Sequence, residues 1–230
     1  MGDRVYGLVG GFRGGACADR LVVEAHELAP MPDISCAVAA AVPLAGMTAL
    51  QALRDLVHVR PGDRVCINGA SGGVGTFAIP IAVRLGGEVT AIASGRNEEF
   101  VRGLGATDFV DYTLGAPPAS ARFDVFFDVF GNWPFARARP LLRRRGRHVT
   151  TLPGPGSIAR ELVSRMWRPK PARLVVVRPR RSDLDLLTRL IDEGALTPIV
   201  DRILPWTEAA AAHAYLETKR ARGKVVLTLD

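Results

Sequence analysis

The short segment between Asn68 and Gly75 combines small residues with a spacing suited to a phosphorylated ligand. It reads Ala70-x-Gly72-x-x-Gly75 and departs from the usual dinucleotide-binding pattern, Gly-x-Gly-x-x-Gly, only at its first position. A β-prone run precedes it, and a helical run to about Leu85 follows it. Because a helix N-terminus presents unpaired backbone N–H groups and partial positive charge, the turn predicts a pyrophosphate site. A glycine turn with a purely structural role is the alternative.

The two glycines of the Ala-x-Gly-x-x-Gly pattern have different expected roles within this turn. Gly72 would let a cofactor approach the backbone, and Gly75 would let the helix pack closely on the strand.

The end of the next β-prone run indicates which dinucleotide the site would prefer. An NAD site usually carries Asp or Glu there, to accept a hydrogen bond from the ribose 2′-hydroxyl. This chain has Ser94-Gly95-Arg96-Asn97 instead, with no carboxylate before Glu98. Since a guanidinium is the natural bidentate partner of a phosphate, these residues favour a 2′-phosphate and hence NADP(H). The alternative is a solvated Arg96 on a loop.

Size and composition fit one large or two small domains. The chain has 230 residues, of which 48% are hydrophobic. No secretory signal is recognised, and the longest apolar run, 36–50, contains Pro43 and is too short for a membrane helix of about 20 residues. We therefore expect a cytoplasmic protein without a membrane partner.

The distribution of charge and the spacing of cysteine and histidine argue against nucleic-acid binding and against metal binding. The net charge is +7, with arginine clusters at 143–147 and 178–181, but neither cluster is interleaved with stacking aromatics. We expect the first cluster to end a helix, where cations offset the dipole, and we expect no nucleic-acid partner. No metal site is expected either, because none of the cysteines and histidines has metal-ligand spacing; they are Cys17, Cys36, Cys66, His26, His58, His148 and His213.

Alternating β-prone and helical runs from residue 63 to residue 179 predict a doubly wound α/β domain with a parallel sheet. The strands are near-continuous apolar runs, as expected when helices cover both faces. They are expected at 64–68, 88–93, 108–111, 123–129, 147–152 and 173–178, with helices at 74–85, 98–104 and 134–143. Pro80 predicts a bend in the first helix near residues 76–79.

The remaining segments suggest an insertion and a mixed C-terminal region. Residues 153–171 form a long insertion that could cap a pocket. A helix at 183–193, capped by Ser182 and closed by Gly194, follows. A strand at 199–204, a helix at 207–218 and a last strand at 224–229 complete the chain.

In this order, the motifs resemble the medium-chain dehydrogenase/reductase superfamily, in its zinc-independent quinone-oxidoreductase-like branch. The resemblance covers nearly the whole chain. The motifs that carry it are Gly-Asp-Arg-Val-Tyr-Gly-Leu at 2–8, Pro-Leu-Ala-Gly-Met-Thr-Ala-Leu-Gln-Ala-Leu at 43–53, the glycine turn, Leu-Gly-Ala-Thr-Asp at 104–108 with Asp-Tyr at 111–112, Phe-Asp-Val-Phe-Phe-Asp-Val-Phe-Gly at 123–131, and Arg-Gly-Lys-Val-Val-Leu at 222–227.

The resemblance implies a set of cofactor-binding residues. It assigns the cofactor phosphates to Ser71, Gly72, Gly73 and Val74, and the 2′-phosphate to Ser94 and Arg96 with Asn97 beside them. It places Tyr112 near the adenosine, Thr48 close to the cofactor, Val129 at the nicotinamide side, and Arg222 on an arm that reaches toward the phosphates. Helix capping by Thr48, core packing of Tyr112 and simple solvation of Arg222 are the alternatives. No catalytic residue is assigned.

The resemblance also implies a domain plan and an activity. Residues 1–46 and 180–230 would be parts of a GroES-like catalytic domain whose first two thirds are absent, and 47–179 would be the Rossmann domain. The implied reaction is zinc-independent hydride transfer from NADPH to an electrophilic small molecule, a quinone or α,β-unsaturated carbonyl. A non-catalytic NADP(H)-binding protein, or an inactive fragment, is the alternative. Relatives commonly dimerise, so a homodimer is compatible with the resemblance.

Overall fold

The structure is a computed structural model that describes residues 2–10, 15–152 and 172–229. The chain divides into two compact units. One, which we call the terminal unit, comprises Met1–Met47 and Val177–Asp230; the other, the central unit, comprises Thr48–Val176. The domain limits expected from the sequence, 46/47 and 179/180, lie within a few residues of these limits. The 153–171 insertion lies outside the described residues.

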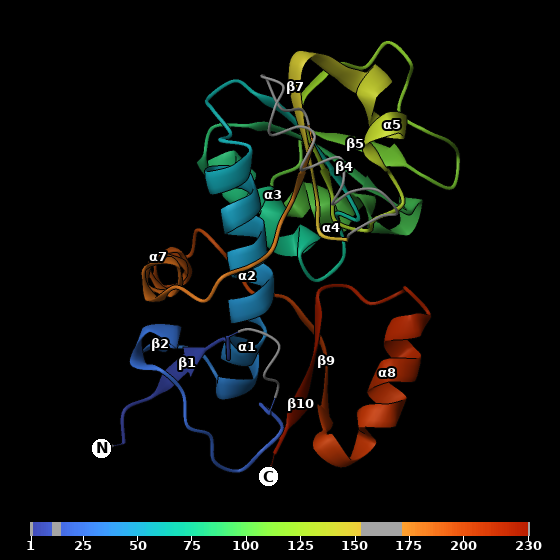
Figure 1. Cartoon of the computed structure of the whole chain (residues 1–230). Helices are drawn as coiled ribbons and strands as arrows, with labels where there is room; N and C mark the ends of the chain where they lie inside the picture. The colour runs from blue at the N-terminus through green and yellow to red at the C-terminus, as the bar shows by residue number, and fades with distance from the viewer. Residues whose placement is uncertain (1, 11–14, 153–171, 230) are drawn as a thin grey trace. The chain divides into compact units, whose positions relative to one another are not determined.

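The described part of the central unit is built on a six-stranded sheet in which all neighbouring strands are parallel (Figure 1). The spatial order is β5-β4-β3-β6-β7-β8. Numbered within this unit, that order is 3-2-1-4-5-6, the doubly wound order of dinucleotide-binding domains, so the expected fold class is confirmed. The strands are β3 (Arg64–Asn68), β4 (Glu88–Ala93), β5 (Asp108–Asp111), β6 (Phe123–Asp128), β7 (Leu142–Thr150) and β8 (Ala172–Leu174).

Helices follow the strands and bury their apolar sides. They are α3 (Gly75–Arg84), the 3₁₀ turn Gly95–Asn97 with α4 (Glu98–Gly103), and α5 (Phe135–Ala138) with the 3₁₀ turn Arg139–Leu141. The middle strands are buried on both faces, which explains their continuous apolar sequences. Phe126 packs in the core against Phe123 and Trp133, with ring centroids 6.3 and 5.3 Å apart. α3 continues through Pro80, and its expected bend stays a prediction.

The side chain of Arg147 holds the segment that leads from the π-helix into β3. α2 (Val42–Leu50) passes into the π-helix Gln51–Leu56. Arg147 of β7 donates to the carbonyl oxygens of Val57 and His58 and to the Asp63 carboxylate, the last at 2.6 Å. Because these acceptors flank the loop before β3, the side chain ties the end of the π-helix to the start of the sheet.

Two elements of the central unit differ from the sequence prediction. The helix expected at 134–143 ends at Ala138, and a 3₁₀ turn containing Pro140 follows it. β7 then begins at Leu142, so the arginine cluster at 143–147 lies in a strand and does not end a helix. Leu142 pairs with Phe123 of β6 and Arg147 pairs with Val125, so five positions along β7 correspond to only two along β6. The extra residues bulge outward, which lets their charges reach solvent.

The terminal unit contains two small sheets. β1 (Val5–Gly7) and β2 (Leu28–Pro30) are antiparallel, and β9 (Val200–Pro205) and β10 (Lys224–Thr228) are parallel. The 3₁₀ turn Ala25–Glu27 precedes β2, and α8 (Ala209–Glu217), entered by the 3₁₀ turn Trp206–Glu208, connects β9 to β10. The described part of this unit also contains α1 (Cys36–Ala40), the first residues of α2, and α7 (Arg181–Asp192).

A buried tyrosine joins β1 to α7 within the terminal unit. The Tyr6 hydroxyl donates to the Leu184 carbonyl at 2.9 Å and shares a second hydrogen bond with the Thr188 hydroxyl. Burial raises the pKa of Tyr6 from 10.0 to about 12, because the phenolate would lose its hydration.

α7 differs from the prediction at its start. Its N-cap is Arg180, which makes no capping hydrogen bond through its side chain, so the predicted Ser182 cap is wrong. The helix ends before Gly194, whose φ of +70° is the left-handed conformation typical of a terminating glycine.

β8 is also shorter than expected, since the predicted strand extended to residue 178. Within the described residues, no helix combines the length and the apolar character that crossing a membrane requires.

Candidate functional site

The carboxyl ends of β3 and β6 define the place where a doubly wound sheet binds its ligand. β3 leads into a connection that continues to β4 on one side, while β6 continues to β7 on the other, so the connections diverge between them. Ligands of such sheets bind in the crevice outside the strand ends at this point. Asn68 and Asp128, the last residues of β3 and β6, are register partners there.

The glycine turn after β3 is held by its own backbone. Gly69 has a φ of +79°, a conformation that favours glycine, and the N–H groups of Gly69 and Ala70 both donate to the Ile92 carbonyl at 3.2 Å. The Gly72 N–H donates to the Gly69 carbonyl at 3.1 Å. These bonds fix the turn against β4 without using the amides that follow it.

Those following amides open α3. The first bond into the helix runs from the Thr76 N–H to the Gly72 carbonyl at 3.0 Å. The N–H groups of Gly73, Val74 and Gly75 therefore have no acceptor within the helix, and the N-cap residue Val74 supplies no side-chain acceptor. A run of amides at a helix N-terminus suits an anion such as a diphosphate.

The two glycines of the motif differ in what surrounds them. A Cβ atom on Gly75 would lie 2.3 Å from the Gly69 carbonyl oxygen and 2.5 Å from that of Ala70, so Gly75 is needed for the helix to pack on the turn. Among the residues that the structure describes, a Cβ atom on Gly72 would meet only the Gly69 carbonyl oxygen, at 3.4 Å, and the φ of Gly72 is not positive. Neither packing nor backbone conformation requires glycine there, so the turn leaves open space that a bound diphosphate would fill.

Three of the predicted site residues form one hydrogen-bonded cluster. The Asn97 side-chain amide donates to the hydroxyl oxygens of Ser71 and Ser94, both at 3.1 Å. Ser71 lies in the glycine turn and Ser94 follows β4, so the cluster bridges the ends of two adjacent strands. Asn97 is only 4% exposed, whereas both serines are half-buried.

Arg96 is exposed on the turn that Asn97 closes. The Asp111 carboxylate, at the end of β5, accepts hydrogen bonds from the backbone N–H and the hydroxyl of Thr113, at 2.9 and 2.7 Å. The Thr113 hydrogen bonds lower the pKa of Asp111 below its usual value. The carboxylate lies close to Gly95, in the turn that carries Arg96.

The other predicted residues lie on separate elements. Tyr112 is 60% exposed, with its N–H bonded to the Ala93 carbonyl at the end of β4, so core packing of its ring is excluded. Thr48 is 7% exposed within α2. Val129 follows β6 and donates to the Asn68 carbonyl at 3.1 Å. Arg222 belongs to the terminal unit, just before β10.

Sequence reasoning missed a buried polar network at the same strand ends. Asp128, 1% exposed, accepts hydrogen bonds from the Asn68 amide and from the N–H groups of Gly131 and Trp133, all at 2.8 Å. The same Asn68 amide also donates to Asn132 at 2.7 Å. This network shapes the loop after β6. The sequence did contain one indication of it, because a polar residue ends each of two apolar runs: Asn68 ends β3 and Asp128 ends β6.

Cys66 and His148 are both buried in the central unit. Cys66 is buried, and desolvation raises the pKa of its thiol well above the usual value. His148 is buried, and its Nε2 is bonded to the Trp133 carbonyl at 2.9 Å. Among the residues that the structure describes, no three or more His, Cys, Asp or Glu side chains cluster so as to hold a metal ion.

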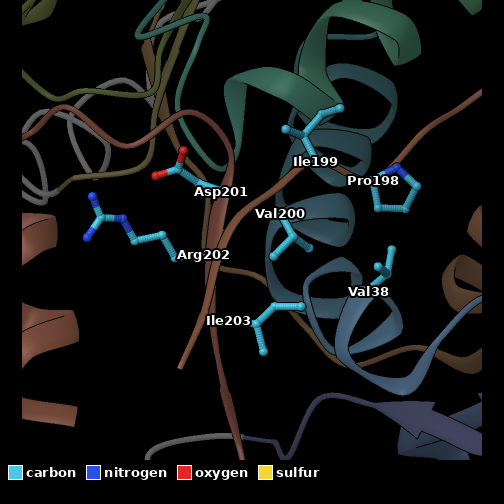
Figure 2. A pocket seen from close by; sticks show the side chains of 7 residues that line it. All are labelled: Val38, Pro198, Ile199, Val200, Asp201, Arg202 and Ile203. Carbon is cyan, nitrogen blue, oxygen red and sulfur yellow. The ribbon is translucent and has the colours of Figure 1, made fainter. Parts of the chain in front are cut away.

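One open pocket lies in the terminal unit and contains none of the predicted cofactor residues. Figure 2 shows Val38 of α1 facing Val200 and Ile203 of β9, while Asp201 and Arg202 extend on the other side of the strand. That polar pair is engaged with α8: Tyr215 donates to Asp201 at 2.6 Å, and the Arg202 guanidinium stacks 3.6 Å from the Tyr215 ring centroid.

The strand order, the glycine turn and the open space at Gly72 define the central unit as a dinucleotide-binding domain of the doubly wound class. Comparison with known proteins gives the family. Residues 104–227 match the family model described as zinc-binding dehydrogenase. The chain belongs to this family, within the medium-chain dehydrogenase/reductase superfamily.

Similar proteins are oxidoreductases by name. The chain is 29% identical to the chloroplast envelope quinone oxidoreductase homolog of Arabidopsis thaliana, over 98% of this chain and 72% of that protein. It is 28% identical to a mitochondrial NAD(P)H oxidoreductase of Mus musculus, over 99% of this chain and 65% of that protein. The solved quinone oxidoreductase of Coxiella burnetii is 29% identical, with a TM-score of 0.89 over 100% of this chain and 73% of that chain.

The chain therefore spans between 65% and 72% of the length of these two curated relatives. The family description names zinc, but it does not by itself assign a metal to this chain.

Proposed function

We propose that the chain binds NADPH and belongs to a zinc-independent reductase that transfers a hydride to a quinone or an α,β-unsaturated carbonyl compound. The names of the similar proteins support the reaction class. The observation that carries the proposal is the glycine at position 72, which the packing of the described residues does not require. A nicotinamide cofactor is supported by the relative named an NAD(P)H oxidoreductase, and the phosphorylated form by Arg96.

The proposed roles follow the position of each residue. Ser71, Gly72, Gly73 and Val74 would hold the diphosphate, and Ser94 and Arg96 the 2′-phosphate. Tyr112 would lie beside the adenosine, Thr48 close to the cofactor and Val129 at the nicotinamide side, and Arg222 would add a cation near the phosphates. The exposure of Tyr112 supports its proposed contact, because an exposed ring is available to a ligand.

The proposed contribution of this chain is to align donor and acceptor, and the proton that completes the reduction of the quinone or enone would come from water. When bound, a dihydronicotinamide supplies a hydride, that is, a proton with two electrons, to an electron-poor carbon. Quinones and enones share such a carbon, conjugated to a carbonyl. The amides before α3 and the two serines would hold the anionic groups, and the Asp128 network would keep the loop carrying Val129 in place.

Cofactor titration tests this proposal. We expect one NADPH bound per chain, detected by the change in dihydronicotinamide fluorescence, and weaker binding of NADH. Replacing Arg96→Ala should weaken NADPH binding by at least about tenfold, the equivalent of losing about 1.4 kcal/mol, and should leave NADH binding within about twofold. Tighter binding of NADH than of NADPH by the unmodified chain would reject the assignment of the 2′-phosphate.

A second candidate function is NADP(H) binding without catalysis, because the chain spans only 65% to 72% of the relatives' length. Stoichiometric NADPH binding with no oxidation across a panel of quinones and enones would favour it. NADPH oxidation by the purified chain would exclude it.

Three further expectations remain predictions. They are the assignment of 1–46 and 180–230 to a GroES-like catalytic domain, the homodimer and the cytoplasmic location. The two curated relatives are named as chloroplast envelope and mitochondrial proteins.

A further inference from the structure

We infer that Asn97 is a positioning residue that turns the hydroxyl hydrogens of Ser71 and Ser94 toward the anionic groups of the ligand. This inference rests on the proposed cofactor site and assigns Asn97 an indirect role in it. The resemblance placed Asn97 beside Ser94 and Arg96, among the cofactor-binding residues. At 4% exposure, its side chain has little surface with which to touch a ligand.

The hydrogen bonds of the cluster fix which atom donates. An asparagine amide nitrogen carries two hydrogens and no acceptor lone pair. In this cluster its two hydrogens are directed to two different oxygens, Ser71 Oγ and Ser94 Oγ, each 3.1 Å from Nδ2. Both serines are therefore acceptors toward Asn97 and cannot donate to it.

Each serine consequently retains its own hydrogen for another acceptor. A hydroxyl has one hydrogen and two lone pairs, and Asn97 occupies one lone pair of each. Throughout the described residues, neither serine has a protein acceptor for that hydrogen. Both residues are half-buried, so neither serine is fully enclosed by the described protein. An oxygen that accepts one hydrogen bond also becomes a better donor through its own hydrogen.

The two hydroxyls belong to segments with different proposed ligands. Ser71 lies in the glycine turn, where the diphosphate would bind, and Ser94 lies after β4, beside Arg96 and the proposed 2′-phosphate. Asn97 holds both segments together across the ends of β3 and β4. Its own place is fixed by its backbone N–H, which donates to the Ser94 carbonyl at 2.8 Å. One buried amide thus orients donors for two negatively charged groups.

A double-mutant cycle distinguishes this role from a structural one. NADPH dissociation constants are measured for Asn97→Leu in the unmodified chain and in a Ser71→Ala/Ser94→Ala background. We expect Asn97→Leu to raise the dissociation constant at least about tenfold in the unmodified chain and less than about twofold in the background without hydroxyls. A merely structural role predicts the same fold-change in both, because the loop would be disturbed with or without the serines.

The near-isosteric Asn97→Asp provides a second cycle if Asn97→Leu does not fold. A carboxylate only accepts, so the serines would donate inward to it, and its charge acts in both backgrounds alike. A larger fold-change in the presence of the serines supports the inference, and equal fold-changes overturn it. Failure of the unmodified chain to bind NADPH overturns the proposed function itself. Normal NADPH binding by the unmodified chain with equal effects in both cycles overturns only the role of Asn97.

Discussion

Replacing each motif glycine by alanine separates the part of the turn that packs from the part that binds. Gly75→Ala puts a methyl group 2.3 and 2.5 Å from two backbone carbonyl oxygens, and backbone cannot yield as a flexible side chain does. Overpacking of this kind costs about 1–3 kcal/mol. For a chain of this size, 1 kcal/mol corresponds to about 2–4 °C, so the melting temperature should fall by about 2–12 °C.

Gly72→Ala should leave stability nearly unchanged and weaken NADPH binding. Within the described part of the chain its methyl group meets only one atom, at 3.4 Å, and no positive φ is involved. Stability should change by no more than about 1 kcal/mol, and a small gain is expected because alanine restricts the unfolded chain. The same methyl group would occupy the space of the diphosphate. Losing one hydrogen bond to a charged group, about 1.5–3 kcal/mol, raises the dissociation constant of NADPH by about 10- to 150-fold.

Thermal unfolding without ligand and fluorescence titration with NADPH give both quantities for both variants. The expected result is a stable Gly72→Ala variant that binds poorly. The reasoning is refuted if Gly72→Ala unfolds as early as Gly75→Ala, or if it binds NADPH as the unmodified chain does.

Three further predictions concern stability. Asp128→Ala leaves three donors without an acceptor and should cost about 2–4 kcal/mol in denaturant unfolding, against about 0.5 kcal/mol or less for the exposed Asp108→Ala. Arg147→Lys cannot reach the three acceptors together and should cost about 1–3 kcal/mol, whereas the exposed Arg145→Lys should be neutral. Tyr6 should titrate near pH 12 in a spectroscopic titration at 295 nm, above the ordinary 10.0. Because its folded pKa is raised, its contribution is complete below pH 10 and is lost as the pH rises toward 12.

Each of these predictions has a clear contradicting outcome. Equal unfolding free energies for Asp128→Ala and Asp108→Ala would show that the network at the end of β6 contributes nothing. An Arg147→Lys variant as stable as the unmodified chain would remove the proposed link to the π-helix. For Tyr6, the decisive control is Tyr6→Phe, which should reduce the loss of stability between pH 10 and 12; an unchanged pH profile contradicts the assignment.

The first half of the sheet could be predicted residue by residue. β3, β4 and β5 begin and end where the sequence indicated, because each is a short apolar run bounded by glycine or charged residues. The glycine turn could also be predicted from the sequence, since its spacing and the following helical run are local features. The hydrogen-bonded cluster of Ser71, Ser94 and Asn97 joined residues that the resemblance had already singled out.

The second half could not be read as well, because it depends on pairing between distant segments. The arginines at 143–147 have the local pattern of a helix end, yet the pairing of Leu142 with Phe123 draws them into β7. Ser182 has a good capping side chain, but α7 begins before it. The role of Asp128 depends on Asn68, sixty positions away, and sequence spacing alone gives no sign of that contact.

The most direct test of the central claim is a crystal structure of this chain determined with NADPH. The account predicts a diphosphate oxygen within hydrogen-bonding distance of the Gly73 or Val74 N–H, above Gly72, and the 2′-phosphate beside Arg96 and the Ser94 hydroxyl. A cofactor bound elsewhere on the chain, with the space at Gly72 filled by protein side chains, would contradict it.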